Sequence, residues 1–152
     1  MSILLTLRYL ALGASVLALA ACGAASAAGY GGSNVSGFQC DPGTQVQLAN
    51  PQPGQTGTPT NIGQIVIVAN GNANNLYNTY GQWNLIVTDN FGNGITGSNL
   101  SAFAYPNGPH PYGSDFYYAS SIPTLAPGRT YNVQLNWTAS NCTPDPLNAF
   151  ST

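Results

Sequence analysis

The residues best suited to acid–base chemistry in this chain are His110 and Asp115. His110 is the single histidine, and Asp115 follows it five residues later. A histidine oriented by a carboxylate can act as a general base, so a small hydrolase using this pair is one interpretation. The pair lies among prolines and glycines, where a loop histidine beside an aspartate is the simpler interpretation. No nucleophile elbow, phosphate-binding loop or metal-ligand spacing accompanies the pair, so we expect no enzyme, no cofactor and no metal.

Tyrosines form a second set of candidate functional residues. They gather near residues 77–83, together with Trp83, and again near residues 105–118. Exposed aromatic rings can stack on the CH faces of sugars while nearby asparagine amides bind the hydroxyls, and they can also contact other proteins. The alternative is that most of these rings fill a hydrophobic core. The candidate ligand-binding residues are Tyr77, Tyr80, Tyr105, Tyr112 and Tyr117.

Charged residues are scarce, at 4% of the chain, and lysine and glutamate are absent. Ordinary soluble proteins carry roughly 25% charged residues. Asparagine supplies much of the polarity instead, which makes the surface hydrogen-bonding but nearly uncharged. Because no basic patch is available to bind phosphates, the composition excludes nucleic acid as a partner.

The N-terminal segment predicts export. Residues 1–21 contain one positive charge, Arg8, followed by an apolar run that is too short for a comfortable membrane span and typical of a signal peptide. Leu19-Ala20-Ala21-Cys22 resembles the lipobox of bacterial lipoproteins. The resemblance implies that Cys22 begins the mature chain and carries the lipid, palmitate included. It also implies a lipid-anchored protein of the cell envelope, facing the periplasm or the exterior.

The remaining N-terminal residues leave an alternative open. Residues 22–38 are rich in glycine, alanine and serine, and we expect a flexible tether ahead of a folded domain at 39–152. Ala25-Ser26-Ala27 also fits the small-x-small rule of an ordinary secretory signal cut after Ala27 or Ala28. In that case the protein would be secreted without a lipid.

The three cysteines fit the lipid-anchored interpretation. If Cys22 is lipidated, Cys40 and Cys142 remain as an even pair near the two ends of the folded region. We predict a disulfide between them, which closes a loop of about 100 residues and stabilises the fold by roughly 4–5 kcal/mol in the chain-entropy model. Two buried free thiols are the alternative.

Regular alternation predicts that the domain is built from strands. In residues 131–138 the odd positions are apolar or aromatic and the even positions are polar, which indicates a half-buried strand that a second sheet must cover. Pro127-Gly128 before it predicts a turn, and Asn93-Gly94 predicts a hairpin with two positive φ values. We expect about seven short antiparallel strands, with no helix after residue 22 and an asparagine-rich connection at 70–80. The expected strands include residues 45–49, 64–69, 82–88, 95–105, 115–122 and 130–139.

Two further stretches resemble a known fold family. Residues 50–61, a proline- and glycine-rich loop before an apolar run, resemble the opening of bacterial immunoglobulin-like domains of the S-layer type. Residues 125–131 resemble the Leu-x-Pro-Gly-x-x-Tyr corner that those domains share with fibronectin type III modules. The resemblance implies an all-β immunoglobulin-like sandwich in which the Tyr131 hydroxyl bonds back to the loop backbone.

Three hypotheses about function follow. The first is a lipid-anchored structural or protein-interaction module of the cell envelope with no catalytic activity, whose partner is an envelope protein or polysaccharide. The second is a carbohydrate-binding module that uses exposed tyrosine, tryptophan and asparagine side chains. The third is the small hydrolase using His110 and Asp115.

Intact-mass analysis of the mature protein tests the N-terminal and cysteine assignments together. We expect a mass that begins at Cys22 and includes the lipid, with the loss of two hydrogens for a Cys40–Cys142 disulfide. A mass that begins at Ala28 or Gly29 without lipid would favour the secreted alternative. Reaction of both remaining cysteines with a thiol reagent would contradict the disulfide.

Overall fold

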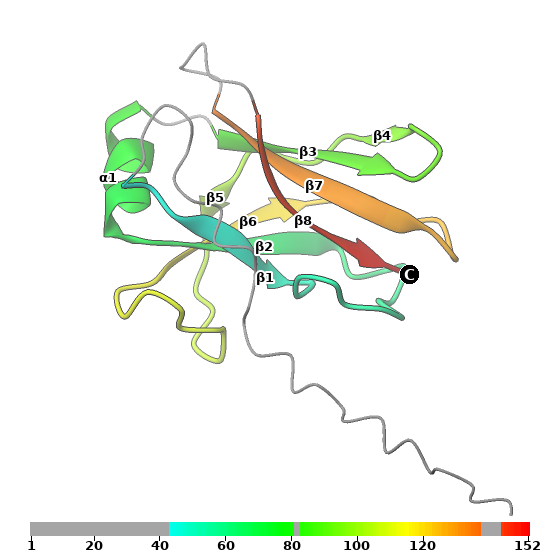
Figure 1. The fold of residues 1–152 in the computed structure, drawn as a ribbon, viewed down its shortest axis with the longest axis horizontal. Coiled ribbons are helices and arrows are strands. Elements are labelled where there is room, and N and C mark those ends of the chain that lie inside the picture. Colours follow the sequence, from blue (N-terminus) through cyan, green and yellow to red (C-terminus); the bar gives the residue numbers. More distant parts are fainter. Residues whose placement is uncertain (1–42, 81–82, 138–143) are drawn as a thin grey trace, which may run out of the picture.

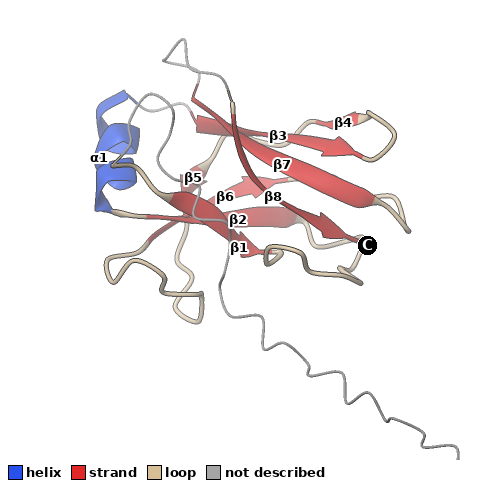
Figure 2. Cartoon of the chain, viewed as in Figure 1, coloured by secondary structure: helices blue, strands red, loops and turns tan. Residues whose placement is uncertain are grey.

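The computed structural model describes residues 43–80, 83–137 and 144–152, which form a β-sandwich with one short helix (Figure 1 and Figure 2). Cys22, Cys40 and Cys142, the signal peptide and most of the tether lie outside the described residues. In chain order the elements are β1 (Val46–Asn50), β2 (Gln64–Ala69), α1 (Gly71–Tyr80), β3 (Trp83–Asp89), β4 (Gly94–Ile95), β5 (Ser101–Ala102), β6 (Phe116–Ser121), β7 (Thr130–Trp137) and β8 (Asp145–Ser151).

Two antiparallel four-stranded sheets make up the sandwich, in the orders β1-β2-β6-β5 and β4-β3-β7-β8. This is the order of immunoglobulin-like folds, in which strands A, B, E and D share one sheet and C, F and G the other, with a further strand beside C. Trp83 on β3 is 1% exposed, at the position where such domains carry a core tryptophan. The expected fold class, an all-β immunoglobulin-like sandwich, is confirmed.

Strand β2 is buried on both faces, as its continuous apolar sequence predicts. Ile65 and Ile67 belong to the main core between the two sheets. Val66 and Val68 face the other way and belong to a second apolar cluster on the outer face of the same sheet. Because both faces of this strand carry apolar side chains, another layer of the protein must cover each of them.

The alternation predicted for the strand at 130–139 is confirmed for residues 131–136, and residues 138 and 139 lie outside the described residues. On β7 the side chains of Tyr131, Val133 and Leu135 are at most 1% exposed, whereas Asn132 is exposed. Strand β7 pairs with β3 along its length, with Val133 opposite Val87. The apolar face of this pair closes the core against the other sheet.

The corner before β7 has the geometry that the family resemblance implies. Gly128 adopts a positive φ of 65°, so the turn delivers Tyr131 directly into the core. The Tyr131 hydroxyl accepts a hydrogen bond from the Ala126 amide at 2.8 Å and donates one to the Ala126 carbonyl at 3.2 Å. Its ring stacks on Phe150 of β8 with a centroid separation of 5.4 Å. The corner is therefore fixed by one side chain that bonds to both backbone groups of one residue.

The prediction of a connection without helix at residues 70–80 is wrong, because α1 occupies this segment. The Asn70 side chain accepts a hydrogen bond from the Ala73 amide at 2.9 Å and so caps the first turn. Ala73, Leu76 and Tyr77 lie at helical spacing and pack on the core. Tertiary packing overrides the low helix propensity of the asparagines. Within the described ranges, no helix has the length and apolar character needed to cross a membrane.

The C-terminal strand and the segment between the sheets differ from the prediction as well. No strand was expected after residue 139, yet β8 pairs with β7, and Pro146 is accommodated at the edge of the sheet. The single strand expected at 95–105 is replaced by β4 and β5, which belong to different sheets. Gly97 permits this crossing, since a Cβ there would lie 2.5 Å from the Ser120 hydroxyl.

The predicted hairpin after β3 is present, but its turn is built differently. Gly92 adopts the positive φ, at 85°, and Gly94 already belongs to β4. The carboxylate of Asp89 accepts hydrogen bonds from the amides of Phe91 and Asn93, at 2.9 and 2.8 Å. An aspartate that binds the turn backbone therefore replaces the expected Asn-Gly geometry.

Three substitutions test the corner and the two faces of β7. We expect Tyr131→Phe to lower the free energy of unfolding by about 1–3 kcal/mol, because the Ala126 amide loses its acceptor while ring packing is kept. Val133→Asp should prevent folding, since it places an unpaired charge in the core. Asn132→Asp should be nearly silent because its side chain is exposed. Chemical denaturation measures all three, and an Asn132→Asp variant less stable than Val133→Asp would contradict the assigned faces.

Candidate functional site

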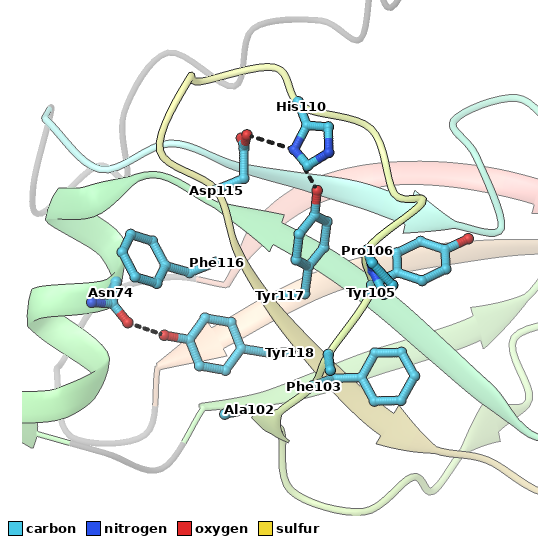
Figure 3. A pocket seen from close by; sticks show the side chains of 11 residues that line it. Asn74, Ala102, Phe103, Tyr105, Pro106, His110, Asp115, Phe116, Tyr117 and Tyr118 are labelled. Atoms are coloured by element: carbon cyan, nitrogen blue, oxygen red, sulfur yellow. Dashed lines mark hydrogen bonds and ion pairs between the residues drawn. The ribbon is translucent and has the colours of Figure 1, made fainter.

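A pocket lies at the edge of the β1-β2-β6-β5 sheet, where β5 ends beside α1. Its volume is about 550 Å³, within the range of roughly 300–1,000 Å³ that is usual for small-ligand sites. Figure 3 shows the side chains that surround it. We call it the aromatic pocket, and it is lined by Asn74, residues 102–106, His110 and residues 115–118.

The loop at 103–115 folds back over the outer face of this sheet. Phe103, Tyr105, Tyr112 and Tyr117 pack on the small apolar cluster that includes Val66 and Val68. The rings of Tyr105 and Tyr117 meet edge to face, with centroids 5.6 Å apart. The loop thus has an apolar base of its own and differs from a solvated connection.

Gly108 allows the loop to approach these rings closely. A Cβ at this position would lie 2.5 Å from Cδ1 of Tyr105 and 2.7 Å from Cε1 of Tyr117. The Gly108 amide donates to the Tyr105 carbonyl at 3.0 Å, which closes a tight turn. Only glycine fits here without movement of an aromatic ring.

The structure brings the predicted acid–base pair together. His110 Nδ1 lies 3.1 Å from Asp115 Oδ2, and it also lies 3.1 Å from the Tyr117 hydroxyl (Figure 3). Asp115 Oδ1 accepts a hydrogen bond from the Tyr112 amide at 3.0 Å. The Tyr117 hydroxyl donates to the Pro109 carbonyl at 2.6 Å. The bonds of Tyr117 tie the middle of the loop to β6, and those of Asp115 hold the loop to itself.

The Asp115 carboxylate is buried within this arrangement, whereas His110 is open to solvent. Their side chains are 3% and 62% exposed. Burial and the neighbouring Asp115 raise the pKa of Tyr112 to about 12, so its phenol stays neutral. The buried Asp115 carboxylate therefore holds the loop from the interior side, and the exposed edge of the His110 ring faces solvent.

The other predicted tyrosines lie apart from this loop. Tyr77 on α1 packs against Trp83 and Tyr118 in the main core, and its hydroxyl donates to the Leu100 carbonyl at 2.9 Å. The side chain of Tyr80 lies outside what the structure describes. Of the five candidates, Tyr105 and Tyr117 line the aromatic pocket, Tyr112 lies in the apolar base beside it, and Tyr77 contributes to the core.

Several residues of the pocket were not among the candidates from the sequence, including Phe103, Phe116 and Asn74. Phe116 is 36% exposed and, with Phe103, adds apolar surface to the pocket. Asn74 on α1 accepts a hydrogen bond from the Tyr118 hydroxyl at 2.7 Å. Burial raises the pKa of Tyr118 to about 12, which keeps this donor protonated. The period-two alternation at 115–122 could have placed Phe116 and Tyr118 on one face, but Asn74 required knowledge of α1.

A second pocket, of about 510 Å³, lies at the opposite end of the sandwich, between the β3–β4 turn and the Tyr131 corner. The Arg129 guanidinium bonds to Asp89 at 2.5 Å and covers the ring of Phe91 at 4.5 Å. Phe91 is 70% exposed. Hydrogen bonds from the Asn93 side chain, then from the Asn93 and Phe91 amides and Arg129, lower the pKa of Asp89 to about 2 against the opposing effect of burial.

The described residues contain no group of three or more histidine, cysteine, aspartate or glutamate side chains that could hold a metal ion. The chain was also compared with known proteins. No protein-family model, curated protein sequence or solved structure matches it.

The depressed pKa of Asp89 gives a test of the turn. Because the folded pKa lies below the ordinary value of 3.8, the ionised carboxylate stabilises the fold above about pH 4, and this contribution is lost as the pH falls toward 2. We expect Asp89→Asn to be less stable than wild type at pH 7, with the difference shrinking between pH 4 and 2. Urea denaturation at a series of pH values measures it. A difference that is independent of pH would contradict the assignment.

Proposed function

We propose that this protein is a binding module of the bacterial cell envelope, held at a membrane by a lipid on Cys22 and without catalytic activity of its own. The observation that carries the binding role is the aromatic pocket, whose shape is set by the hydrogen-bonded loop at 103–115. A site that is already ordered avoids the entropic cost of ordering a loop when a ligand binds.

The residues of the pocket favour a ligand that is bound through aromatic contacts over one that is bound through its charge. Asp115 is the only aspartate among the pocket residues, and its carboxylate is buried and hydrogen-bonded. Aromatic side chains supply large contact area at low entropic cost, which suits an envelope protein or polysaccharide as partner.

The lipid anchor is supported by the sequence around Cys22. The four residues that end there have the lipobox pattern, and the apolar run before them has the length of a signal peptide. A lipid-anchored module would act within the envelope, facing the periplasm or the exterior.

The hydrolase hypothesis remains second to binding, although His110 and Asp115 do lie in contact. In the described part of the chain, the hydrogen-bond partners of the His110 ring are Asp115 and the Tyr117 hydroxyl, and no serine or threonine hydroxyl is among them. A nucleophile hydrogen-bonded to its base is the arrangement that covalent catalysis requires. The contacts of His110 instead support a role in holding the loop.

Fractionation of expressing bacteria tests the anchor. We expect the wild-type protein in the membrane fraction and the Cys22→Ala variant outside it, because the variant lacks the thiol that would carry the lipid. Immunoblotting of the fractions measures the distribution, and labelling with a palmitate analogue reports the lipid. Equal distributions of the two proteins would contradict the anchor.

Binding to envelope material tests the pocket. Detergent-solubilised protein is incubated with purified envelope fractions, and Gly108→Ala is compared with Gly71→Ala. A Cβ at Gly108 meets two tyrosine rings, whereas one at Gly71 meets nothing within 4 Å. We expect about tenfold weaker retention for Gly108→Ala only. Failure of the wild type to retain any protein or polymer would contradict the proposed function.

A further inference from the structure

The hydrogen bonds around His110 determine which of its ring nitrogens carries the proton. The Tyr117 hydroxyl directs its hydrogen to the Pro109 carbonyl, because a carbonyl can only accept. Its oxygen is therefore an acceptor toward His110 Nδ1, and the Asp115 carboxylate is an acceptor as well. Both contacts of Nδ1 are satisfied only if Nδ1 carries the hydrogen. In the neutral ring, Nε2 then has a free lone pair.

This assignment leaves two complementary polar groups in the aromatic pocket. His110 Nε2 is an acceptor on a side chain that is 62% exposed. Asn74 uses its side-chain oxygen to accept from Tyr118, and its amide NH2 donates no hydrogen bond to the described residues. A hydroxyl group can donate to the first and accept from the second, which makes a polyhydroxylated ligand the matching chemistry.

The walls of the pocket fit a sugar ring. Phe103, Tyr105, Phe116 and Tyr117 contribute aromatic surface to the pocket, and Phe116 lies on the side nearest Asn74 (Figure 3). The CH-rich faces of a pyranose are apolar and pack on aromatic rings, while its edges carry hydroxyls. A sugar ring therefore offers an apolar face to the aromatic side chains of the pocket and hydroxyls to its hydrogen-bonding groups.

Two other classes of ligand that bind in aromatic pockets, anions and quaternary ammonium groups, fit these residues less well. An anionic ligand would find no lysine or arginine among the pocket residues and would face the Asp115 carboxylate. A trimethylammonium group would gain cation–π contacts but would leave the free groups of His110 and Asn74 unpaired. An uncharged ligand that bears hydroxyls can form hydrogen bonds with both His110 Nε2 and the NH2 group of Asn74.

We propose that the aromatic pocket binds a neutral carbohydrate, with His110 Nε2 accepting a hydrogen bond from one of its hydroxyls and Asn74 donating to another. The inference rests on the proposed binding function and specifies the chemical class of its ligand. It assigns His110 two roles, since Nδ1 holds the loop and Nε2 contacts the ligand.

Two substitutions separate these roles. His110→Asn places an amide N–H where Nδ1–H lies, so the loop contacts are retained, but it removes the Nε2 acceptor. Asn74→Asp keeps an oxygen for the Tyr118 hydroxyl and removes the N–H donor. Asn132→Asp, on the exposed face of the other sheet, is the control.

Binding of the full-length protein to immobilised neutral polysaccharides is measured in a detergent without a sugar headgroup. The probes are glucans, mannans, galactans and N-acetylglucosamine polymers, with uronic-acid polysaccharides and choline in parallel. We expect binding to a neutral polymer, weakened about three- to tenfold by His110→Asn and by Asn74→Asp at an unchanged melting temperature. The Asn132→Asp control should bind as wild type does.

Several outcomes would overturn the inference. Binding to choline or to the acidic polymers alone would assign a different ligand, and equal binding by wild type and both pocket variants would remove the two polar contacts. Absence of binding to every neutral polymer, with Gly108-dependent retention of an envelope protein, would refute the carbohydrate and leave the proposed function standing. Absence of both kinds of binding would refute both.

Discussion

The burial of β2 on both faces is the constraint on which the rest of the structure depends. A strand with apolar side chains on alternate faces can be stable only between two covering layers. The inner face of β2 is covered by the β4-β3-β7-β8 sheet, which makes the sandwich. Its outer face is covered by aromatic side chains of the loop at 103–115, which makes the pocket. To cover both faces of the six residues of β2, the domain therefore needs both the opposite sheet and the loop beside the aromatic pocket.

Period-two patterns made the sandwich predictable from the sequence, because strand side chains alternate between core and solvent. Residues 83–89 and 131–135 behave as this rule requires, and the tyrosine corner lies where the short motif at 125–131 places it. The elements that escaped prediction depend on tertiary contacts. Helix α1 is rich in asparagine and is held by a cap and by packing, and β8 carries a proline that only an edge position accommodates. Local sequence carries little of that information.

The candidate site was predictable in part. The sequence places His110 and Asp115 close enough to meet, and the structure joins them at 3.1 Å. The sequence could not indicate whether the tyrosines would lie in the core or at the surface. Both occur, since Tyr77 packs in the main core and Tyr105 lines the pocket. Neither spacing nor composition shows that a loop of prolines and glycines closes on an apolar patch. That patch arises from the outer face of a strand about 40 residues earlier in the chain.

The C-terminal strand has a mechanical consequence. Strand β8 is hydrogen-bonded to β7 on one side and to residues 54–58 on the other, and Thr152 lies at the end of the sandwich away from α1 (Figure 1). Gly43 lies beside α1, where the side chains of Asn70 and Asn72 donate to its carbonyl. A tension applied between these two points runs parallel to the strands, so the bonds of β8 are sheared together instead of being peeled one after another. Separation of β8 from β7 under such a tension then requires the cooperative loss of the whole ladder between them.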